Sequence, residues 1–240
     1  MIKLSKRLRA VASMVSDGSY LADIGTDHGY IPIYLTKKGT VCHAIAMDVN
    51  KGPLLRAQEH IKKEGLNAYI ETRLSDGLKS LTEGEADSIV IAGMGGALIL
   101  RILTDSSALL QSFSEIILQP QSEVEEVRRY LSANGFGIVQ EDMVEEDGKY
   151  YPMMRCVPGR YDESDDTEEM TTADYRYGAL LLKKAHPVLK EFLQKEETQL
   201  GVILASLDAQ EETEAIIARR AEVKKKRAVI RKAWEKMGAV

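Results

Sequence analysis

The strongest indication of the fold is a nine-residue stretch, Ala22-Asp23-Ile24-Gly25-Thr26-Asp27-His28-Gly29-Tyr30. It has the pattern of a buried strand that ends in a glycine-containing turn and then enters a helix. Glycines in such a turn let the backbone approach a ligand closely, and they place that ligand at the amino end of the helix. The stretch therefore predicts an α/β domain whose ligand site lies at the carboxyl end of a parallel strand.

Outward from this turn, apolar runs of strand length alternate with helical patterns. The expected strands are residues 20–24, 43–48, 68–74, 88–92 and 115–119, and the expected helices include residues 1–15, 31–38, 53–64 and 124–131. This alternation predicts βαβ units and a parallel sheet. Two more strand-like runs, 137–145 and 150–157, flank Glu146-Asp147-Gly148-Lys149, which is a hairpin signature. A parallel sheet that ends in an antiparallel hairpin resembles the Rossmann-like class I methyltransferases, which implies a mainly parallel seven-stranded sheet.

The last third of the chain is helical in pattern. Residues 159–169 read as an acidic linker, and we expect an α/β domain at 1–160 and a helical domain at 161–240. Apolar residues then recur at heptad spacing, with Glu196 as one polar exception, in a seam that comprises Leu189, Leu193, Leu200, Ile203, Leu207, Ile216, Val223, Ile230 and Met237. A polar break near 208–214 divides the seam, which predicts an antiparallel helical hairpin or coiled coil. A simple cap on the core is the alternative.

Composition excludes several classes of protein. The 240 residues are 44% hydrophobic and 29% charged, as in globular enzymes. No apolar run approaches the length of about 20 residues that spans a bilayer, and the N-terminal segment lacks the apolar core of a signal peptide. Cys42 and Cys156 lie far apart in the sequence, and the four histidines show no metal-site spacing. We expect a cytoplasmic protein without a metal or a membrane anchor.

The formal net charge of −5 hides a strong asymmetry. Residues 219–236 contain nine basic and two acidic residues, so this segment carries +7 and the rest of the chain carries −12. A second basic cluster lies near the N-terminus. Clustered cations displace counterions from nucleic-acid phosphates, although a solvated face that balances the acidic core is the alternative. The candidates for RNA contact are Lys6, Arg7, Arg9, Arg220, Lys224, Lys225 and Arg227.

Acidic residues at the first glycine turn indicate which ligand it holds. The spacing lacks the G-x-G-x-x-G pattern of dinucleotide enzymes, and Asp23 and Asp27 bracket the turn. Carboxylates suit a cationic amino group or a sulfonium better than a pyrophosphate, and S-adenosylmethionine offers both cations. Asp48 and Asp76 follow the next two strands, where they are placed to accept the ribose hydroxyls and the adenine amino group. Each has an alternative as a residue that merely caps a turn.

The fourth strand enters Ala92-Gly93-Met94-Gly95-Gly96. Many methyltransferases that act on amino groups of nucleic acids carry an N/D-P-P-Y/F loop at this position to hold the target amine. Its absence makes an exocyclic amine a less expected acceptor, and a glycine-rich loop leaves room for a flat base.

The strings 23–32, Ser75-Asp76-Gly77 and 91–96 together resemble the bacterial tRNA methyltransferases that modify N1 of adenosine at position 22. The resemblance runs through the whole chain and implies S-adenosylmethionine as cofactor, tRNA as substrate, and a monomer or weak homodimer. Asp27 is the candidate catalytic residue, because a carboxylate near the base would stabilise the positive charge of the methylated ring; a contact that caps the turn or binds only the cofactor is the alternative. The residues expected to contact the cofactor are Asp23, Gly25, Asp27, His28, Gly29, Asp48, Val49, Asn50, Ser75, Asp76, Gly77, Ala92, Gly93, Met94 and Gly95.

Two other functions are compatible with the sequence. One is a methyltransferase that acts on a small molecule or a protein and uses the helical tail to dimerise. The other is a non-catalytic module that binds S-adenosylmethionine and pairs with a protein partner through its heptad helices.

Overall fold

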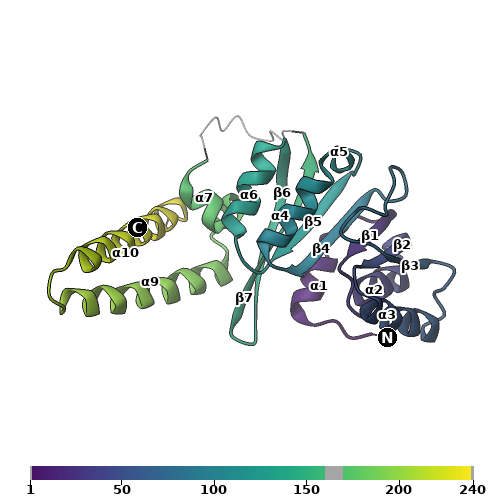
Figure 1. Cartoon of the computed structure of the whole chain (residues 1–240), viewed down its shortest axis with the longest axis horizontal. Coiled ribbons are helices and arrows are strands. Elements are labelled where there is room, and N and C mark those ends of the chain that lie inside the picture. The colour runs from purple at the N-terminus through teal and green to yellow at the C-terminus, as the bar shows by residue number, and fades with distance from the viewer. Residues whose placement is uncertain (1, 160–169, 239–240) are drawn as a thin grey trace. The chain divides into compact units, whose positions relative to one another are not determined.

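The computed structural model describes residues 2–159 and 170–238, which form two compact units (Figure 1). We call them the α/β unit (2–159) and the helical unit (170–238). The expected domain boundary at 160/161, and all of the expected acidic linker except Gly159, lie outside the described residues. No helix in the described ranges is long and apolar enough to cross a membrane.

A seven-stranded sheet forms the centre of the α/β unit. Its strands are β1 (Ser19–Ile24), β2 (Val41–Asp48), β3 (Ile70–Leu74), β4 (Ser88–Met94), β5 (Glu115–Pro120), β6 (Phe136–Glu146) and β7 (Lys149–Pro158). Their spatial order is β3-β2-β1-β4-β5-β7-β6, with β1 to β5 parallel and β7 antiparallel to both of its neighbours. The predicted α/β class and the terminal hairpin are therefore confirmed.

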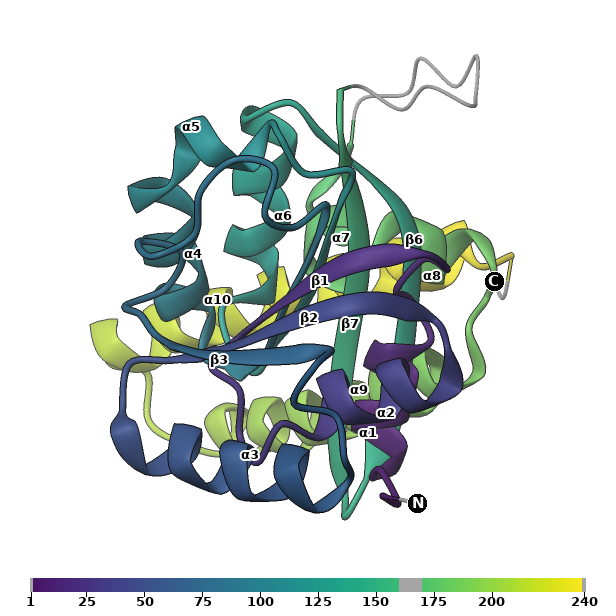
Figure 2. The ribbon, with the colours of Figure 1, turned by 90° about the vertical axis from the view of Figure 1, so that its right-hand side faces the viewer.

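Helices cover both faces of the sheet (Figure 2). One face packs against α1 (Lys6–Ala12), α2 (Tyr30–Lys38) and α3 (Lys51–Lys63), and the other against α4 (Gly96–Asp105), α5 (Ser107–Leu110) and α6 (Val124–Ala133). Successive strand residues alternate between the two layers: Ile89 and Ile91 join the α4–α6 core, whereas Val90 joins the α1–α3 core. Burial on both faces explains why these strands read as continuous apolar runs.

The β6–β7 turn follows directly from its sequence. Asp147 and Gly148 have φ angles of 53° and 75°, the left-handed conformation at both central positions that a two-residue type I′ turn requires. Asp-Gly is a favoured pair for this turn because its twist matches the twist of the two strands.

Several element boundaries differ from the sequence prediction. The first helix spans only Lys6–Ala12, because the Ser5 hydroxyl caps its start by accepting a hydrogen bond from the Leu8 N–H. Met14 and Val15 stay buried in turns after the helix, so the apolar spacing continues where the helix does not. Helix α3 begins at Lys51, two residues before Pro53. Strand β3 begins at Ile70 rather than at residue 68.

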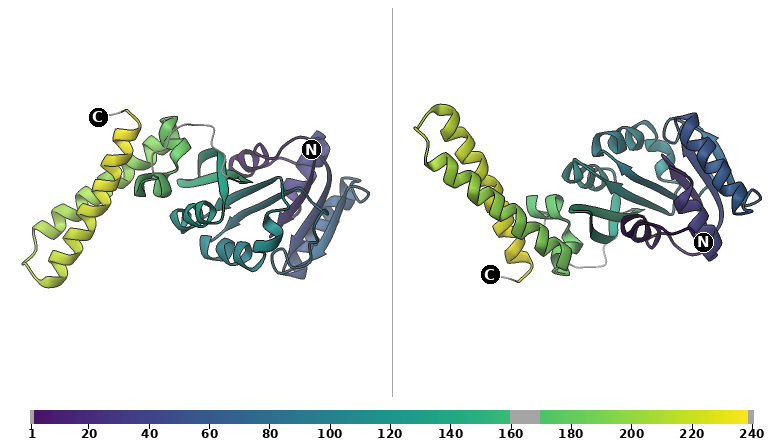
Figure 3. Two further views of the ribbon diagram at one scale, coloured as in Figure 1. Left: turned by 90° about the horizontal axis from the view of Figure 1, so that it is seen from above. Right: turned by 90° about the horizontal axis from the view of Figure 1, so that it is seen from below.

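The helical unit contains α7 (Thr172–Tyr177), α8 (Ala179–Lys183), α9 (Pro187–Asp208) and α10 (Glu214–Lys236). Helices α9 and α10 lie side by side (Figure 3), which confirms the predicted helical hairpin. The seam residues Leu189, Leu193, Leu200, Leu207, Val223 and Ile230 are buried. Glu196, the polar exception, has its own partners, because it pairs with Arg176 and accepts a 2.8 Å hydrogen bond from the Tyr177 hydroxyl.

Candidate active site

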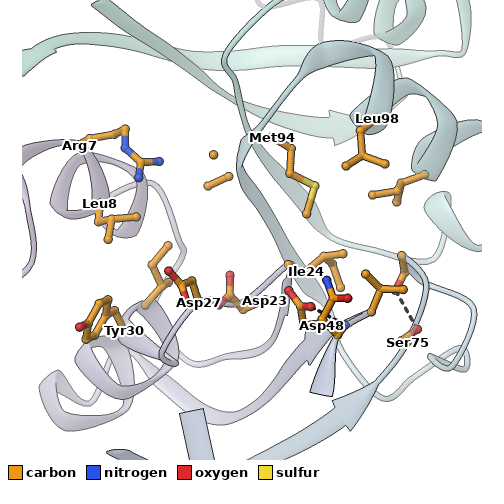
Figure 4. Close-up of a pocket in the computed structure, with 18 of the residues that line it drawn as sticks. Arg7, Leu8, Asp23, Ile24, Asp27, Tyr30, Asp48, Ser75, Met94 and Leu98 are labelled. Atoms are coloured by element: carbon orange, nitrogen blue, oxygen red, sulfur yellow. Dashed lines mark hydrogen bonds between the residues drawn. The ribbon is translucent and has the colours of Figure 1, made fainter. Parts of the chain in front are cut away.

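A cavity of about 910 Å³ lies in the α/β unit at the carboxyl ends of the parallel strands (Figure 4). This is where open α/β sheets bind ligands, and the volume suits a nucleoside-sized group with a second ligand beside it. Most of the predicted cofactor contacts line it: Asp23, Gly25, Asp27, Asp48, Val49, Asn50, Ser75, Asp76, Gly77, Ala92, Gly93 and Met94. The sheet thus brings together residues spread over 72 positions of sequence, from 23 to 94.

Three predicted contacts do not line the cavity, because each has a structural task instead. His28 stacks against the rings of Tyr30 and His60, with centroid separations of 5.1 and 5.3 Å. Gly29 is the N-cap residue of α2, and Gly95 is the N-cap residue of α4. Sequence spacing alone does not distinguish a turn residue that faces the ligand from one that supports the turn.

Asp23, at the end of β1, is the most buried acid of the cavity, with 6% of its surface exposed. Burial raises the pKa of its carboxyl to about 6; the neighbouring Thr26 hydroxyl opposes this rise, and the Asp48 carboxylate adds to it. A carboxylate held in this way gains strongly from a cationic ligand, because the cation replaces the lost hydration.

Asp27 differs from Asp23 in setting, although only four positions separate them. Its side chain is 68% exposed, and its Oδ1 lies 3.3 Å from both the Arg56 guanidinium and His28 Nε2. Exposed pairs at this distance contribute little to stability. Asp27 is therefore accessible to a second ligand that enters the cavity, and its neighbours orient it without burying it.

Asp48 and Asp76 follow β2 and β3. Asp48 Oδ1 accepts a 2.6 Å hydrogen bond from the Asn50 N–H, so the turn-capping alternative is real for this oxygen, while Oδ2 has no hydrogen-bond donor within the described residues. Asp76 accepts from Lys79 at 2.6 Å and from Arg101 at 2.9 Å. The Lys79 hydrogen bond, followed by the charges of Arg101 and Lys79, lowers the pKa of Asp76, so it stays an acceptor.

Two glycines of the cavity allow a neighbouring side chain to approach the backbone closely. Gly25 has φ of +74°, and a Cβ atom there would come within 2.0 Å of the Met94 methyl group. Met94 therefore fills the space that the glycine was expected to leave for a ligand. Gly93 has φ of +80°, and a Cβ atom there would meet Arg7 Nη1 at 3.2 Å. The turn after β1 therefore packs against the end of β4, and Arg7 packs against Gly93.

Seven further residues line the cavity from outside the glycine turns, and no sequence pattern singled them out for the site: Ser5, Leu8, Leu98, Arg101, Ile102, Glu146 and Tyr151. Tyr30, which directly follows the first glycine turn, lines it as well. Arg7 was expected on an RNA-binding surface, and it too lines the cavity. The backbone N–H of Lys6 donates to Glu146 at 2.6 Å, which ties the start of α1 to the hairpin. Ser5, Glu146 and Tyr151 have no sequence pattern that would assign them to the site, because they reach it only through tertiary packing.

The predicted RNA contacts on α10 divide into two kinds. Arg220 is only 17% exposed; it lies 2.8 Å from the Asp208 carboxylate and donates to Glu212 and to the Leu207 carbonyl, so it joins the two long helices. Lys224, Lys225 and Arg227 are exposed, and within the described residues they have no ion-pair partner. Arg220 is therefore held by partners within the helical unit, whereas the other three have no ion-pair partner within the described residues.

Comparisons with known proteins agree with this geometry. Residues 4–154 match the family model of a methyltransferase domain. The chain is 38% identical over 195 residues to the tRNA (adenine(22)-N(1))-methyltransferase of Bacillus subtilis (strain 168), a match that covers 81% of this chain and 82% of that protein.

Two solved structures are similar over nearly the whole chain. Streptococcus pneumoniae Sp1610 in complex with S-adenosyl-L-methionine has a TM-score of 0.84 and 34% identity, covering 96% of this chain and 99% of that one. M. capricolum TrmK in complex with S-adenosyl-homocysteine has a TM-score of 0.82 and 29% identity, covering 98% and 99%.

Proposed function

The chain belongs to the tRNA (adenine(22)-N(1))-methyltransferase family, and we propose that it transfers a methyl group from S-adenosylmethionine to N1 of adenosine 22 in tRNA. The observation that carries the proposal is the set of carboxylates at the ends of three neighbouring strands, Asp23, Asp48 and Asp76, in one cavity with a glycine-rich loop. The similar structures that bind this cofactor or its product support the same assignment.

The residues of the cavity fit this cofactor. Asp48 Oδ2 is free to accept from ribose hydroxyls, and Asp76 keeps acceptor capacity for an amino group. Asp23 is a buried acid next to Gly25 whose pKa is raised to about 6, so a bound ammonium group stabilises its ionised form. S-adenosylmethionine supplies an electrophilic methyl group on a sulfonium, and the residues of this chain hold and orient it.

The acceptor chemistry needs little from a general base. Adenine N1 carries a lone pair, so it attacks without losing a proton, and positioning for an in-line displacement supplies much of the acceleration. The methylated ring gains a positive charge. Asp27, exposed at the edge of the cavity, is placed to stabilise that charge, and we assign it this role.

We assign the electrostatic contacts to the tRNA backbone to exposed cations on each unit. On the helical unit these are Lys224, Lys225 and Arg227. On the α/β unit they are Arg9, which is exposed on α1, and Lys6, whose ammonium group donates to the Glu145 carbonyl at 3.1 Å. Such contacts give sequence-independent affinity that falls with salt. We also expect the enzyme to be cytoplasmic and to be a monomer or a weak dimer. Sedimentation velocity measures the oligomeric state directly.

A methyl-transfer assay tests the proposed function. The purified protein is incubated with labelled S-adenosylmethionine and unmodified tRNA transcripts, and the tRNA is digested to identify the methylated nucleoside and its position. The matched control is a transcript with guanosine in place of adenosine 22. We expect N1-methyladenosine in the first transcript and no label in the control.

Other outcomes separate the remaining functions. Cofactor binding without transfer to any tRNA would contradict the proposal and favour a different acceptor or a non-catalytic binding module. Equal labelling of the control transcript would contradict the assignment to position 22 while leaving the reaction type intact.

A further inference from the structure

The two ends of the cavity differ in charge (Figure 4). Asp23, Asp48 and Asp76 lie at the ends of β1, β2 and β3, which are neighbours in the sheet. Arg7 enters the other end from the first turn of α1, and its neighbours belong to β4, β5 and β7. The acids that fit the cofactor and the surroundings of Arg7 therefore lie on different sides of the cavity.

Two contacts hold the Arg7 guanidinium in place. Nη1 donates to Gln119 Oε1 at 2.8 Å, and the guanidinium carbon lies 5.4 Å from the centroid of the Tyr151 ring, in cation–π contact. Gln119 is itself fully buried and held, because Oε1 also accepts from the Gly93 N–H at 3.2 Å and its amide donates to the Pro120 carbonyl at 3.1 Å. Arg7 is therefore fixed beside the loop after β4.

These contacts leave the positive charge of Arg7 unpaired. Gln119 and Tyr151 are neutral, and no carboxylate in residues 2–159 or 170–238 lies within 4.0 Å of the guanidinium nitrogens. Glu146 also lines the cavity, but its carboxylate accepts the Lys6 backbone N–H. Arg101, the other arginine among the lining residues, is paired with Asp76. Only one N–H of Arg7 has an acceptor within the described residues, so several donors remain for a ligand.

We propose that Arg7 binds the backbone phosphate of the nucleotide whose base enters the cavity. The inference rests on the proposed function, since it concerns the acceptor side of the same site. A nucleotide turned out of its stack carries its phosphate to the rim of the pocket. A planar guanidinium with free N–H groups matches phosphate oxygens, especially when a stacked ring limits the freedom of the side chain. Arg7 is then a substrate-binding residue, and Gln119 is a positioning residue that aims it.

Arg7→Gln tests the proposal, with Arg129→Gln on α6 as the single-charge control. We expect Arg7→Gln to raise the KM for tRNA about 10- to 100-fold, the range for a lost hydrogen bond to a charged group. The Kd for S-adenosylhomocysteine, measured by titration calorimetry without tRNA, should change less than twofold. Arg7→Lys, which keeps the charge but not the planar group, should lie between Arg7→Gln and the unmodified chain.

A tRNA with one methylphosphonate at the target adenosine locates the contact. This tRNA should bind the unmodified chain as weakly as normal tRNA binds Arg7→Gln. Combining the methylphosphonate with Arg7→Gln should not weaken tRNA binding further. Additive losses would overturn the assignment to this phosphate. A weaker cofactor Kd with an unchanged tRNA KM would also overturn it, because Arg7 would then belong to the cofactor.

Gln119→Glu provides a second test that leaves Arg7 in place. The new carboxylate would pair with the guanidinium and neutralise it, so the KM for tRNA should rise while circular dichroism and the cofactor Kd stay unchanged. An unchanged KM would contradict the proposal even if the Arg7 variants fold poorly. Failure of the proposed function looks different, since the unmodified chain would then methylate no tRNA at all.

Discussion

The α/β unit and the helical unit carry opposite charges in different physical settings. The cavity acids include Asp23, with 6% of its surface exposed and a pKa raised to about 6, whereas Lys224, Lys225 and Arg227 are exposed on α10. Salt screens the charge of a buried acid only weakly, and pH decides whether that acid is ionised. Exposed cations stay charged, and the strength of their contacts with phosphates falls as the salt concentration rises. The net charge of −5 therefore describes neither site. We expect pH to affect cofactor binding and salt to affect tRNA binding.

The largest effect should come from removing the acid assigned to the ribose. Asp48→Ala removes two hydrogen bonds to a charged acceptor, so we expect cofactor affinity to fall about 100-fold or more, while tRNA affinity changes less than twofold. Calorimetric titration with S-adenosylhomocysteine at low and high salt measures this. A loss of cofactor affinity under threefold would contradict the role of Asp48. A loss that is much smaller at high salt would show that salt screens the carboxylate as it screens an exposed charge.

Asp27→Ala should come next. It removes the carboxylate assigned to the charged product ring, so we expect kcat at saturating tRNA and cofactor to fall about 10- to 100-fold with little change in either affinity. Asp27→Asn is the matched variant, because it keeps the shape and removes the charge. Full turnover in Asp27→Ala would remove this residue from the mechanism and leave geometry as the source of the acceleration.

Cofactor affinity should depend on pH through Asp23. A bound ammonium group favours the ionised carboxyl, so the Kd should rise about tenfold for each pH unit below 6 and stay nearly constant between pH 7 and 8. Asp23→Asn should bind weakly and without this dependence. A pH profile that is the same for the two proteins would contradict the role of Asp23.

Asp23 should also affect the stability of the free protein. Its pKa in the folded chain, about 6, lies above the ordinary value of 3.8, so its contribution to stability is fully present below pH 3.8 and is lost as the pH rises through 6. Asp23→Asn should therefore raise the free energy of unfolding at pH 7 by about 1 to 3 kcal/mol. Denaturant titrations at pH 4 and pH 7 measure this, and the gain should shrink at pH 4.

On the helical unit, the combined variant Lys224→Ala, Lys225→Ala and Arg227→Ala should weaken tRNA binding about tenfold near physiological salt. The slope of log affinity against log salt should become shallower by about 2 to 3, since each lost phosphate contact removes about 0.7 to 0.9. The matched control replaces Arg219, Lys226 and Arg231, which are already paired with Glu222 or Glu235. Equal slopes for both variants would contradict a special role for the free cations.

The smallest effect on binding should come from Arg220→Ala. This residue joins α9 and α10 through Asp208, Glu212 and the Leu207 carbonyl, so its loss should lower the stability of the helical hairpin by about 1 kcal/mol. The salt slope of tRNA binding should stay the same. A slope that falls by a full phosphate contact would return Arg220 to the RNA-binding set.

The sequence predicts the sheet and its acids well because both leave local signals. Strands buried on two faces read as apolar runs, and acids at consecutive strand ends meet at one edge of a parallel sheet. The helical hairpin also leaves a local signal, since buried apolar residues such as Leu189 on α9 and Val223 on α10 belong to series with heptad spacing. The sequence carries no signal where a neighbour from another element sets the surroundings of a side chain: His28 stacks on His60, and Arg220 pairs with Asp208.

Local patterns in the sequence specify the α/β order, the Asp-Gly hairpin and the helical tail, and they place three acids at the ends of consecutive strands. These features depend on periodicity, turn conformation and the direction of parallel strands, which short segments specify. Only the tertiary structure decided which end of the cavity carries a positive charge. Arg7 lies 112 residues from Gln119 and 144 from Tyr151, and the packing of α1 beside β5 and β7 brings them together. No local pattern encodes a contact between segments so far apart, because it depends on how whole elements pack.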